Sequence, residues 1–242
     1  MTQPPVFTPL TVRNVTVRNR LWVPPMCMYS ALGRDGLATG WHQIHYGSLA
    51  RGGAGLVMVE ATGVTPEGRI SPHDLGLWND DQRTSLGAVA ATIRSFRAVA
   101  GIQLGHAGRK ASTDKPWGGK AQFKPEDAHG WQTVSASDIP FQAHEHAPHA
   151  LSHDEIQKVI ADFAAAAVRA VDAGFDLIEL HAAHGYLLHQ FMSPLSNQRE
   201  DEYGGSFENR IRLTLEVLQA IKNAVPAHYP VGIRISATDW ME

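Results

Sequence analysis

The segment Asp176-Leu-Ile-Glu-Leu-His181-Ala-Ala-His184-Gly-Tyr186 joins a short apolar run to a turn that carries two imidazoles and a phenol. The apolar run does not alternate cleanly with polar residues, which is typical of a parallel strand that is covered on both faces. Parallel α/β proteins place their active sites beyond the carboxyl ends of such strands. The segment therefore predicts an α/β fold with its chemistry at this end of the sheet.

Four further apolar runs have the same character, and segments with helical periodicity separate them. Asn79 and Ser152 are each followed three residues later by Gln or Glu, a capping-box pattern that predicts the start of a helix. Further helices are expected over 41–51 and from Ser206. This alternation favours βαβ units in a parallel sheet. The expected strands are 21–23, 55–60, 100–104, 176–181 and 231–236.

Polar residues at or just past the ends of these strands favour a barrel over an open, doubly wound sheet. They are Cys27, Glu60, Gln103, His181 and Arg234. The predicted fold is therefore a (β/α)8 TIM barrel, of which residues 1–242 supply about five of the eight strands as a single, partial domain. The stretch 105–150 is rich in Gly, Pro, Trp and His and is too long for an ordinary connection. We expect it to form an excursion over the barrel mouth, with a small hairpin of its own.

The composition excludes several classes of protein. A net charge of −3 leaves no basic surface for nucleic acid or for an anionic membrane. No apolar run approaches the roughly 20 residues of a membrane span, and the N-terminus lacks the features of a signal peptide. The single cysteine precludes an internal disulfide framework and suits a reducing compartment. We therefore expect a cytoplasmic protein.

His181 and His184 lie three residues apart on the predicted turn, and Tyr186 follows them. Two imidazoles on one turn can direct two N–H donors at one oxygen atom, and the phenol can donate a proton. The residues alone leave two other interpretations open. The imidazoles could satisfy local backbone groups, or they could bind a metal ion together with Glu179. A metal site here would favour a metal-dependent barrel hydrolase. It is the weakest of the three interpretations, and we expect no metal ion.

Five motifs follow one another along the chain in a specific combination. They are Pro25-Met-Cys-Met-Tyr-Ser30, Glu60-Ala-Thr-Gly-Val64, Gln103-Leu-Gly-His-Ala-Gly-Arg-Lys110, the run from His181 through Phe191 to Asn197, and Asp201-Glu-Tyr-Gly-Gly-Ser206-Phe-Glu-Asn-Arg210. Together they resemble the Old Yellow Enzyme family, and in particular its bacterial class with a cysteine and a His/His pair. The resemblance implies a (β/α)8 barrel that binds FMN. It also implies a ping-pong reaction in which NADPH or NADH reduces the flavin, which then reduces the C=C bond of an α,β-unsaturated carbonyl compound.

The resemblance also implies a role for individual residues. His181 and His184 match the donors that bind the substrate carbonyl, and Tyr186 matches the proton donor. Tyr29 and Lys110 match further residues of the substrate pocket. The resemblance assigns Cys27 to tuning of the flavin potential, with no covalent role. Positions that line the isoalloxazine ring are matched by Pro25, Met26, Cys27, Ala61, Gln103 and Arg234.

The sequence departs from the family pattern after the fifth expected strand. The family continues for roughly a hundred residues that hold three more strands, the phosphate-binding loops and C-terminal arginines. We expect the chain to be a truncated piece of a full enzyme, because every matched active-site residue is present. Two alternatives stay open: one part of an enzyme that a partner completes, and a non-catalytic interaction module. The resemblance implies a homo-oligomer and a small-molecule substrate.

Overall fold

A computed structural model describes residues 4–119 and 122–241. Its centre is a sheet of five strands in the order β3-β4-β5-β8-β9, and every neighbouring pair is parallel. The expected strands are confirmed, and β4 extends beyond its expected end at residue 60. The strands are β3 (Trp22–Val23), β4 (Leu56–Gly63), β5 (Val99–Gly105), β8 (Leu177–Ala182) and β9 (Val231–Ile235).

Four long helices connect these strands: α1 (Gly40–Arg51), α2 (Asp80–Ser95), α3 (His153–Asp172) and α5 (Phe207–Ala224). The capping boxes predicted at the starts of α2 and α3 are present, and a serine side chain caps α5. The helices pack against one face of the sheet through fully buried side chains such as Ile93, Phe163 and Val217. That layer forms the main core.

A smaller apolar cluster lies on the other face of the sheet, toward the amino ends of the strands. Leu56 and Met58 of β4 pack there with Val99 and Leu177. Val17 covers them from a hairpin of β1 (Leu10–Val12) and β2 (Val15–Val17), which follows the short 3-10 helix η1 (Pro5–Phe7). The hairpin closes the end of the sheet where the strands begin. The polar residues of the predicted site lie at the opposite end.

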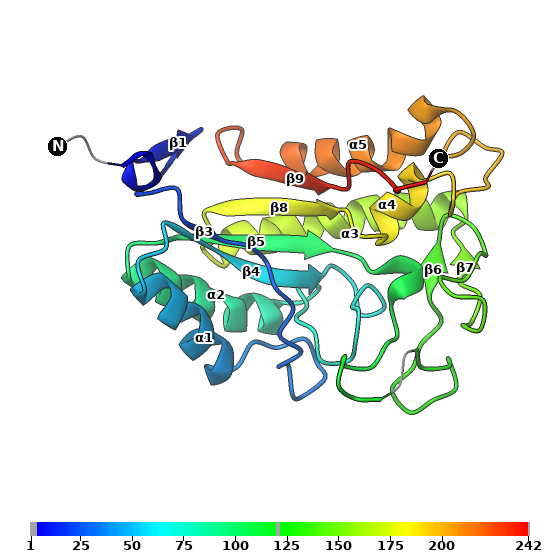
Figure 1. The fold of residues 1–242 in the computed structure, drawn as a ribbon, viewed down its shortest axis with the longest axis horizontal. Helices are drawn as coiled ribbons and strands as arrows, with labels where there is room; N and C mark the ends of the chain where they lie inside the picture. Colours follow the sequence, from blue (N-terminus) through cyan, green and yellow to red (C-terminus); the bar gives the residue numbers. More distant parts are fainter. Residues whose placement is uncertain (1–3, 120–121, 242) are drawn as a thin grey trace.

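The arrowheads of β4, β5, β8 and β9 point to that opposite end, where α4 (Leu187–Met192), β6 (Val134–Ser135) and β7 (His149–Ala150) lie (Figure 1). A curled parallel sheet with its helices on one face is the arrangement of four successive βα units and a fifth strand of a TIM barrel, as predicted. Both outer strands, β3 and β9, have a single neighbour in the described sheet. None of the helices in the described residues is long and apolar enough to span a membrane.

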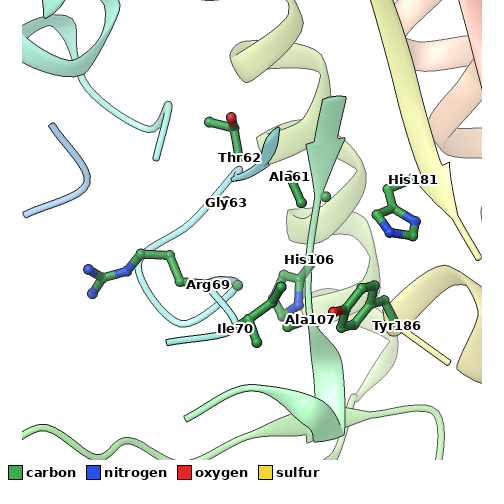
Figure 2. A pocket seen from close by; sticks show the side chains of 11 residues that line it. Ala61, Thr62, Gly63, Arg69, Ile70, His106, Ala107, His181 and Tyr186 are labelled. Atoms are coloured by element: carbon green, nitrogen blue, oxygen red, sulfur yellow. The ribbon is translucent and has the colours of Figure 1, made fainter. Parts of the chain in front are cut away.

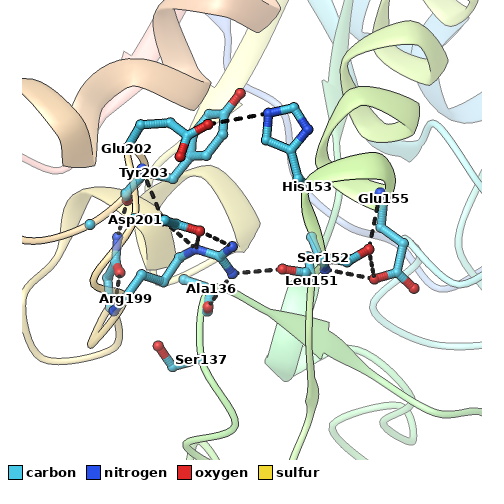
Figure 3. A network of polar contacts seen from close by, with 12 residues as sticks. Ala136, Ser137, Leu151, Ser152, His153, Glu155, Arg199, Asp201, Glu202 and Tyr203 are labelled. Atoms are coloured by element: carbon cyan, nitrogen blue, oxygen red, sulfur yellow. Dashed lines mark hydrogen bonds and ion pairs between the residues drawn. The ribbon is translucent and has the colours of Figure 1, made fainter.

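The excursion between β5 and α3 contains η2 (Gly108–Lys110), β6 and β7, and its residues 120 and 121 lie outside the described residues. The strands β6 and β7 do not form the expected hairpin, because they pair in parallel. The excursion also has an isolated antiparallel bridge between Thr113 and Gln122. Parallel pairing brings the residues that follow the two strands, Ala136 and Leu151, to the same end. Arg199 donates hydrogen bonds to both of their carbonyl oxygens, at 3.0 and 2.6 Å (Figure 3). Asp201 holds the guanidinium of Arg199 in turn.

Candidate active site

Residues at the carboxyl ends of four neighbouring strands share the inner face of the sheet. Ala61 pairs with Gln103, Gln103 with Glu179, and His181 with Arg234. Paired residues of parallel strands, and residues two apart on one strand, point to the same face. The structure therefore brings together Ala61, Gln103, His181 and Arg234, which the sequence placed in one site.

A β-bulge at Glu60 sets the position of Ala61 in this row. The register between β4 and β5 shifts between Val59 and Ala61, so that Glu60 is the extra residue. Bulges redirect side chains and are common next to active sites. Here the bulge aligns Ala61 with Gln103, while Glu60 is fully buried and contacts Tyr46 of α1.

The carboxyl group of Glu60 is held by the chain's own donors. Its Oε1 accepts a hydrogen bond from the Tyr46 hydroxyl at 2.9 Å, and its Oε2 accepts one from the Met28 N–H at 2.8 Å. Burial raises the pKa of Glu60 to about 7. Glu60 thus fixes the segment that follows β3. From the sequence, Glu60 was expected at a strand end and within a family motif, and an acid that ends an apolar strand was a signal for this role.

Cys27 and Asp74 complete a buried acidic cluster with Glu60, with ligand atoms within 4.8 Å of one another. Asp74 Oδ2 accepts a hydrogen bond from Ser71 N, and burial raises the pKa of Asp74 to about 7. Burial, with a further contribution from the two carboxyl groups, also raises the pKa of the Cys27 thiol. The thiol therefore stays protonated at neutral pH, and a protonated thiol is a poor nucleophile.

His181, His184 and Tyr186 form the predicted donor cluster, and His181 contacts both of the other two residues. Its ring centre lies 5.1 Å from that of His184 and 4.9 Å from that of Tyr186, and Figure 2 shows His181 and Tyr186 side by side on one side of the pocket. The Nδ1 atom of His181 accepts a hydrogen bond from Ala183 N–H at 3.2 Å. Burial lowers the pKa of His181 to about 3, so the ring is neutral and carries its proton on Nε2. That N–H group is a donor for a ligand.

Lys110, at the end of η2, packs against the turn that carries His184 and Tyr186. Burial raises the pKa of Tyr186, so its hydroxyl keeps its proton at neutral pH. Lys110 Nζ lies 5.1 Å from the centre of the Tyr186 ring and donates a hydrogen bond to the carbonyl oxygen of His184 at 2.9 Å. His184 has a φ of +58°, a strained conformation of the kind that collects at functional sites. Its N–H donates to Ser236 Oγ at 3.0 Å.

Gln103 is almost fully buried, and its orientation is determined by Glu179. The amide Nε2 donates a hydrogen bond to Glu179 Oε1 at 2.7 Å. Because a carboxylate only accepts, the amide nitrogen must face Glu179. The second N–H and the carbonyl oxygen of Gln103 then remain for a ligand. From the sequence, Glu179 was expected only as a possible metal ligand, so its bond to Gln103 was not predicted.

The segment Pro25–Tyr29 continues from β3 without regular structure. Met26 is 45% exposed, and Tyr29 has a φ of +53°. The Tyr29 ring meets Trp117 of the excursion edge-on, with 5.7 Å between ring centres. Cys27 and Tyr29 lie near enough to Tyr186 to contribute to its raised pKa.

Two residues for which no role was predicted, His106 and Arg69, also line the pocket of Figure 2. His106 is buried, accepts a hydrogen bond from Gly108 N–H on Nδ1, and has a pKa that burial lowers to about 4. Arg69 points away from Tyr186, and its guanidinium lies over the rings of Trp78 and Trp131. His106 stood inside one of the recognised motifs, which was the available signal.

The described residues contain one group of three possible metal-ligand atoms close enough to share an ion, the acidic cluster of Cys27, Glu60 and Asp74. His181, His184 and Glu179 do not form such a group within the part of the chain that is described. The Glu179 carboxylate instead binds Gln103. The geometry therefore favours a donor site for an oxygen atom over the metal interpretation.

The family model for the NADH:flavin oxidoreductase / NADH oxidase family matches residues 5–242. The chain belongs to this family. Among curated relatives, an NADH:flavin oxidoreductase of Gibberella zeae is 50% identical over 98% of this chain and 58% of its own length. An NADPH dehydrogenase of Bacillus cytotoxicus is 46% identical over 97% of this chain and 63% of its own length. The chain thus spans about three-fifths of these relatives.

Solved structures of the same family superpose well on the chain. Morphinone reductase in complex with tetrahydroNAD matches with a TM-score of 0.83 and 31% identity, over 96% of this chain and 64% of that chain. The Old Yellow Enzyme homologue from Zymomonas mobilis matches with a TM-score of 0.81 and 30% identity, over 96% of this chain and 63% of that chain. The predicted membership of the Old Yellow Enzyme family and the barrel fold are confirmed.

Proposed function

We propose that this member of the NADH:flavin oxidoreductase family uses FMN and NADPH or NADH to reduce the C=C bond of α,β-unsaturated carbonyl compounds by a ping-pong reaction. The observation that carries the proposal is the convergence of His181, His184 and Tyr186 beside Gln103 and Arg234 at one end of the sheet. The names of the relatives support the coarser activity, a flavin-dependent NAD(P)H oxidoreduction.

The free polar atoms of the inner face fit the pyrimidine edge of a flavin. That edge alternates carbonyl acceptors with an N–H donor, and the Gln103 amide has one N–H and one carbonyl oxygen left beyond its bond to Glu179. Arg234 would stabilise negative charge on the ring, and Ala61 with the segment Pro25–Cys27 would line it. When bound, FMN supplies a two-electron carrier that accepts a hydride and passes it on.

The donor cluster fits the oxygen atom of an enone. His181 presents Nε2–H because its Nδ1 is used by the backbone, and we infer that His184 supplies a second N–H. Donors that face an oxygen on which negative charge develops stabilise the transition state more than the ground state. Tyr186 retains its hydroxyl proton and is the group that donates a proton to the α-carbon.

We infer that the excursion over 105–150 caps this site within a single partial-barrel domain. Trp117 contacts Tyr29, and Lys110 Nζ lies 4.6 Å from the centre of the Phe141 ring as well as near Tyr186. Aromatic walls of this kind favour flat, apolar substrates. A cytoplasmic location and a homo-oligomer stay predictions.

Product analysis tests the proposed reaction. The purified protein is incubated with FMN, NADPH and cyclohexenone without oxygen, and the products are separated by gas chromatography. We expect one cyclohexanone for each NADPH consumed. NADPH consumption that does not depend on the enone, or a product reduced at the carbonyl group, would overturn the proposal.

A further inference from the structure

Gln190 of α4 is a buried side chain, 1% exposed, whose carboxamide makes four hydrogen bonds. Its Nε2 donates to the carbonyl oxygens of Ala107 at 3.1 Å and Gly185 at 2.7 Å. Its Oε1 accepts from Arg109 N–H at 3.1 Å and from the Ser135 hydroxyl at 3.0 Å. Two N–H groups and two lone pairs are all that a carboxamide has, so none is left for a ligand.

These four partners belong to three different walls of the candidate site. Ala107 and Arg109 follow β5 and lead directly to Lys110, whereas Gly185 lies between His184 and Tyr186. Ser135 belongs to β6 of the excursion. One side chain therefore joins the lysine segment, the donor turn and the capping excursion.

The orientation of the Gln190 amide follows from its partners. Two of them are carbonyl oxygens, which only accept hydrogen bonds, and one is a backbone N–H, which only donates. The amide cannot be turned over without losing at least three of its four bonds. A carboxylate at this position would face two carbonyl oxygens and be repelled by them.

Gly108 adapts the backbone to this side chain. It has a φ of +61°, which side chains rarely tolerate, and a Cβ atom there would lie 2.2 Å from Gln190 Oε1. Glycine at this position is thus required both by the conformation and by the close approach of the amide. Gln190 thus fills the space that the missing side chain of Gly108 leaves, and its carboxamide fits tightly against the backbone there.

We propose that Gln190 is a positioning residue that holds the His184–Tyr186 turn against the Lys110 segment and the excursion, so that the donors converge on one oxygen atom of the substrate. The nature of that substrate rests on the proposed function. Gln190 itself touches no ligand and acts through the backbone at Gly185 and Arg109.

The test compares Gln190→Met with Gln82→Met in the flavin-loaded protein. Gln82 is also fully buried, but it bonds to Trp78, Asn79 and Asp35, outside the proposed ligand contacts. Calorimetry measures the affinity for phenol, whose oxygen is a probe for the carbonyl oxygen, and hydrogen exchange follows the amides of residues 185 and 186. Turnover of cyclohexenone is measured below the melting temperature of both variants.

We expect Gln190→Met to weaken phenol binding about tenfold, to speed exchange at residues 185 and 186 and to lower kcat. Gln82→Met should lower the melting temperature with phenol affinity within about twofold of the unsubstituted protein. If Gln190→Met does not fold, Ser135→Ala removes one of the four bonds and should weaken phenol about two- to fivefold with faster exchange.

Two kinds of failure are distinguishable. If the unsubstituted protein holds no flavin and binds no phenol, the proposed function fails. If it binds both, and the folded Gln190 or Ser135 variant keeps the phenol affinity and the exchange rates, the positioning role of Gln190 is overturned. An equal loss of phenol affinity in Gln82→Met would also overturn it, since general destabilisation would then explain the result.

Discussion

Two polar clusters occupy the same end of the sheet, and they differ in which atoms the chain itself uses. In the acidic cluster, both oxygens of the Glu60 carboxyl accept hydrogen bonds from the chain itself, one from the Tyr46 hydroxyl and one from Met28 N–H. In the donor cluster, the backbone uses the acceptor atom of His181 and leaves its N–H donor free. Tyr186 likewise keeps its hydroxyl proton.

This difference separates residues that fix the structure around the site from residues that have donor atoms left for a ligand. A buried polar group without a partner is costly, and Glu60 avoids that cost through internal hydrogen bonds. The N–H donor of His181 and the hydroxyl of Tyr186 lie at a pocket, where they can donate hydrogen bonds to an oxygen atom of a ligand. Substitutions at Glu60 and Tyr46 should therefore act on stability, and those in the donor cluster on binding and rate.

Tyr186→Phe should give the largest effect, because it removes the proton donor and little else. We expect reoxidation of the reduced flavin by cyclohexenone to slow by roughly a thousandfold, within the range for loss of a general acid, with flavin binding retained. Stopped-flow absorbance measures this rate. Tyr46→Phe is the matched control, since it removes a hydroxyl from the acidic cluster. Equal slowing in both variants would erase the distinction between the clusters.

His181→Ala combined with His184→Ala should weaken phenol binding by about a hundredfold or more. Each imidazole is expected to donate to an oxygen that carries partial negative charge, and such bonds contribute about 1.5–3 kcal/mol each. Titration calorimetry measures the affinity. His149→Ala is the control, because that imidazole pairs with Glu155 on the surface. Unchanged phenol affinity in the double variant would remove both residues from the site.

Glu60→Gln should change the pH dependence of stability and leave phenol affinity nearly unchanged. Folding raises the pKa of Glu60 from 4.5 to about 7, so the folded state binds the extra proton. Stability from this proton is fully present below pH 4.5 and is lost as the pH rises through 7. The shift corresponds to about 3 kcal/mol, which the glutamine variant does not lose.

Unfolding measured from pH 5 to pH 8 checks this prediction. The unsubstituted protein should lose stability relative to Glu60→Gln over that range. Parallel profiles for the two proteins would show that the Glu60 proton is not linked to folding.

Trp117→Ala should give the smallest effect. The indole is 68% exposed and meets Tyr29 edge-on, so its removal costs one aromatic contact of about 0.5–1.5 kcal/mol. We expect KM for a bulky aromatic enone to rise about two- to tenfold, with less change for cyclohexenone. Phe207→Ala, at an exposed position on α5, is the control. An equal change in KM for the bulky enone and for cyclohexenone would argue that Trp117 does not form a wall of the substrate pocket.

Much of the site was predictable from sequence because the carboxyl ends of parallel strands meet at one edge. This rule alone placed Gln103, His181 and Arg234 near one another, and the register of β5, β8 and β9 confirmed their proximity. The capping boxes likewise gave the starts of α2 and α3. These features depend on local chemistry or on strand order.

The rest depends on contacts between distant segments. The bulge at Glu60 follows from pairing between β4 and β5, which no local pattern reveals. The ends of the parallel strands β6 and β7 are joined by Arg199, which follows both strands in the chain and binds the carbonyl groups of Ala136 and Leu151. Helix α4 is too short for a helical periodicity to be visible, so the role of Gln190 was not predicted.

In the proposed reaction, the inner face of the sheet holds a flavin. The donor cluster binds the carbonyl oxygen of the electron-poor alkene that the flavin reduces. Anaerobic titration of the purified protein with NADPH, followed by cyclohexenone, tests this reaction most directly through the visible absorbance of bound flavin. We expect bleaching in proportion to NADPH and full recovery of absorbance on addition of cyclohexenone. Flavin that remains oxidised in NADPH, or that remains bleached in the enone, would contradict the proposed reaction.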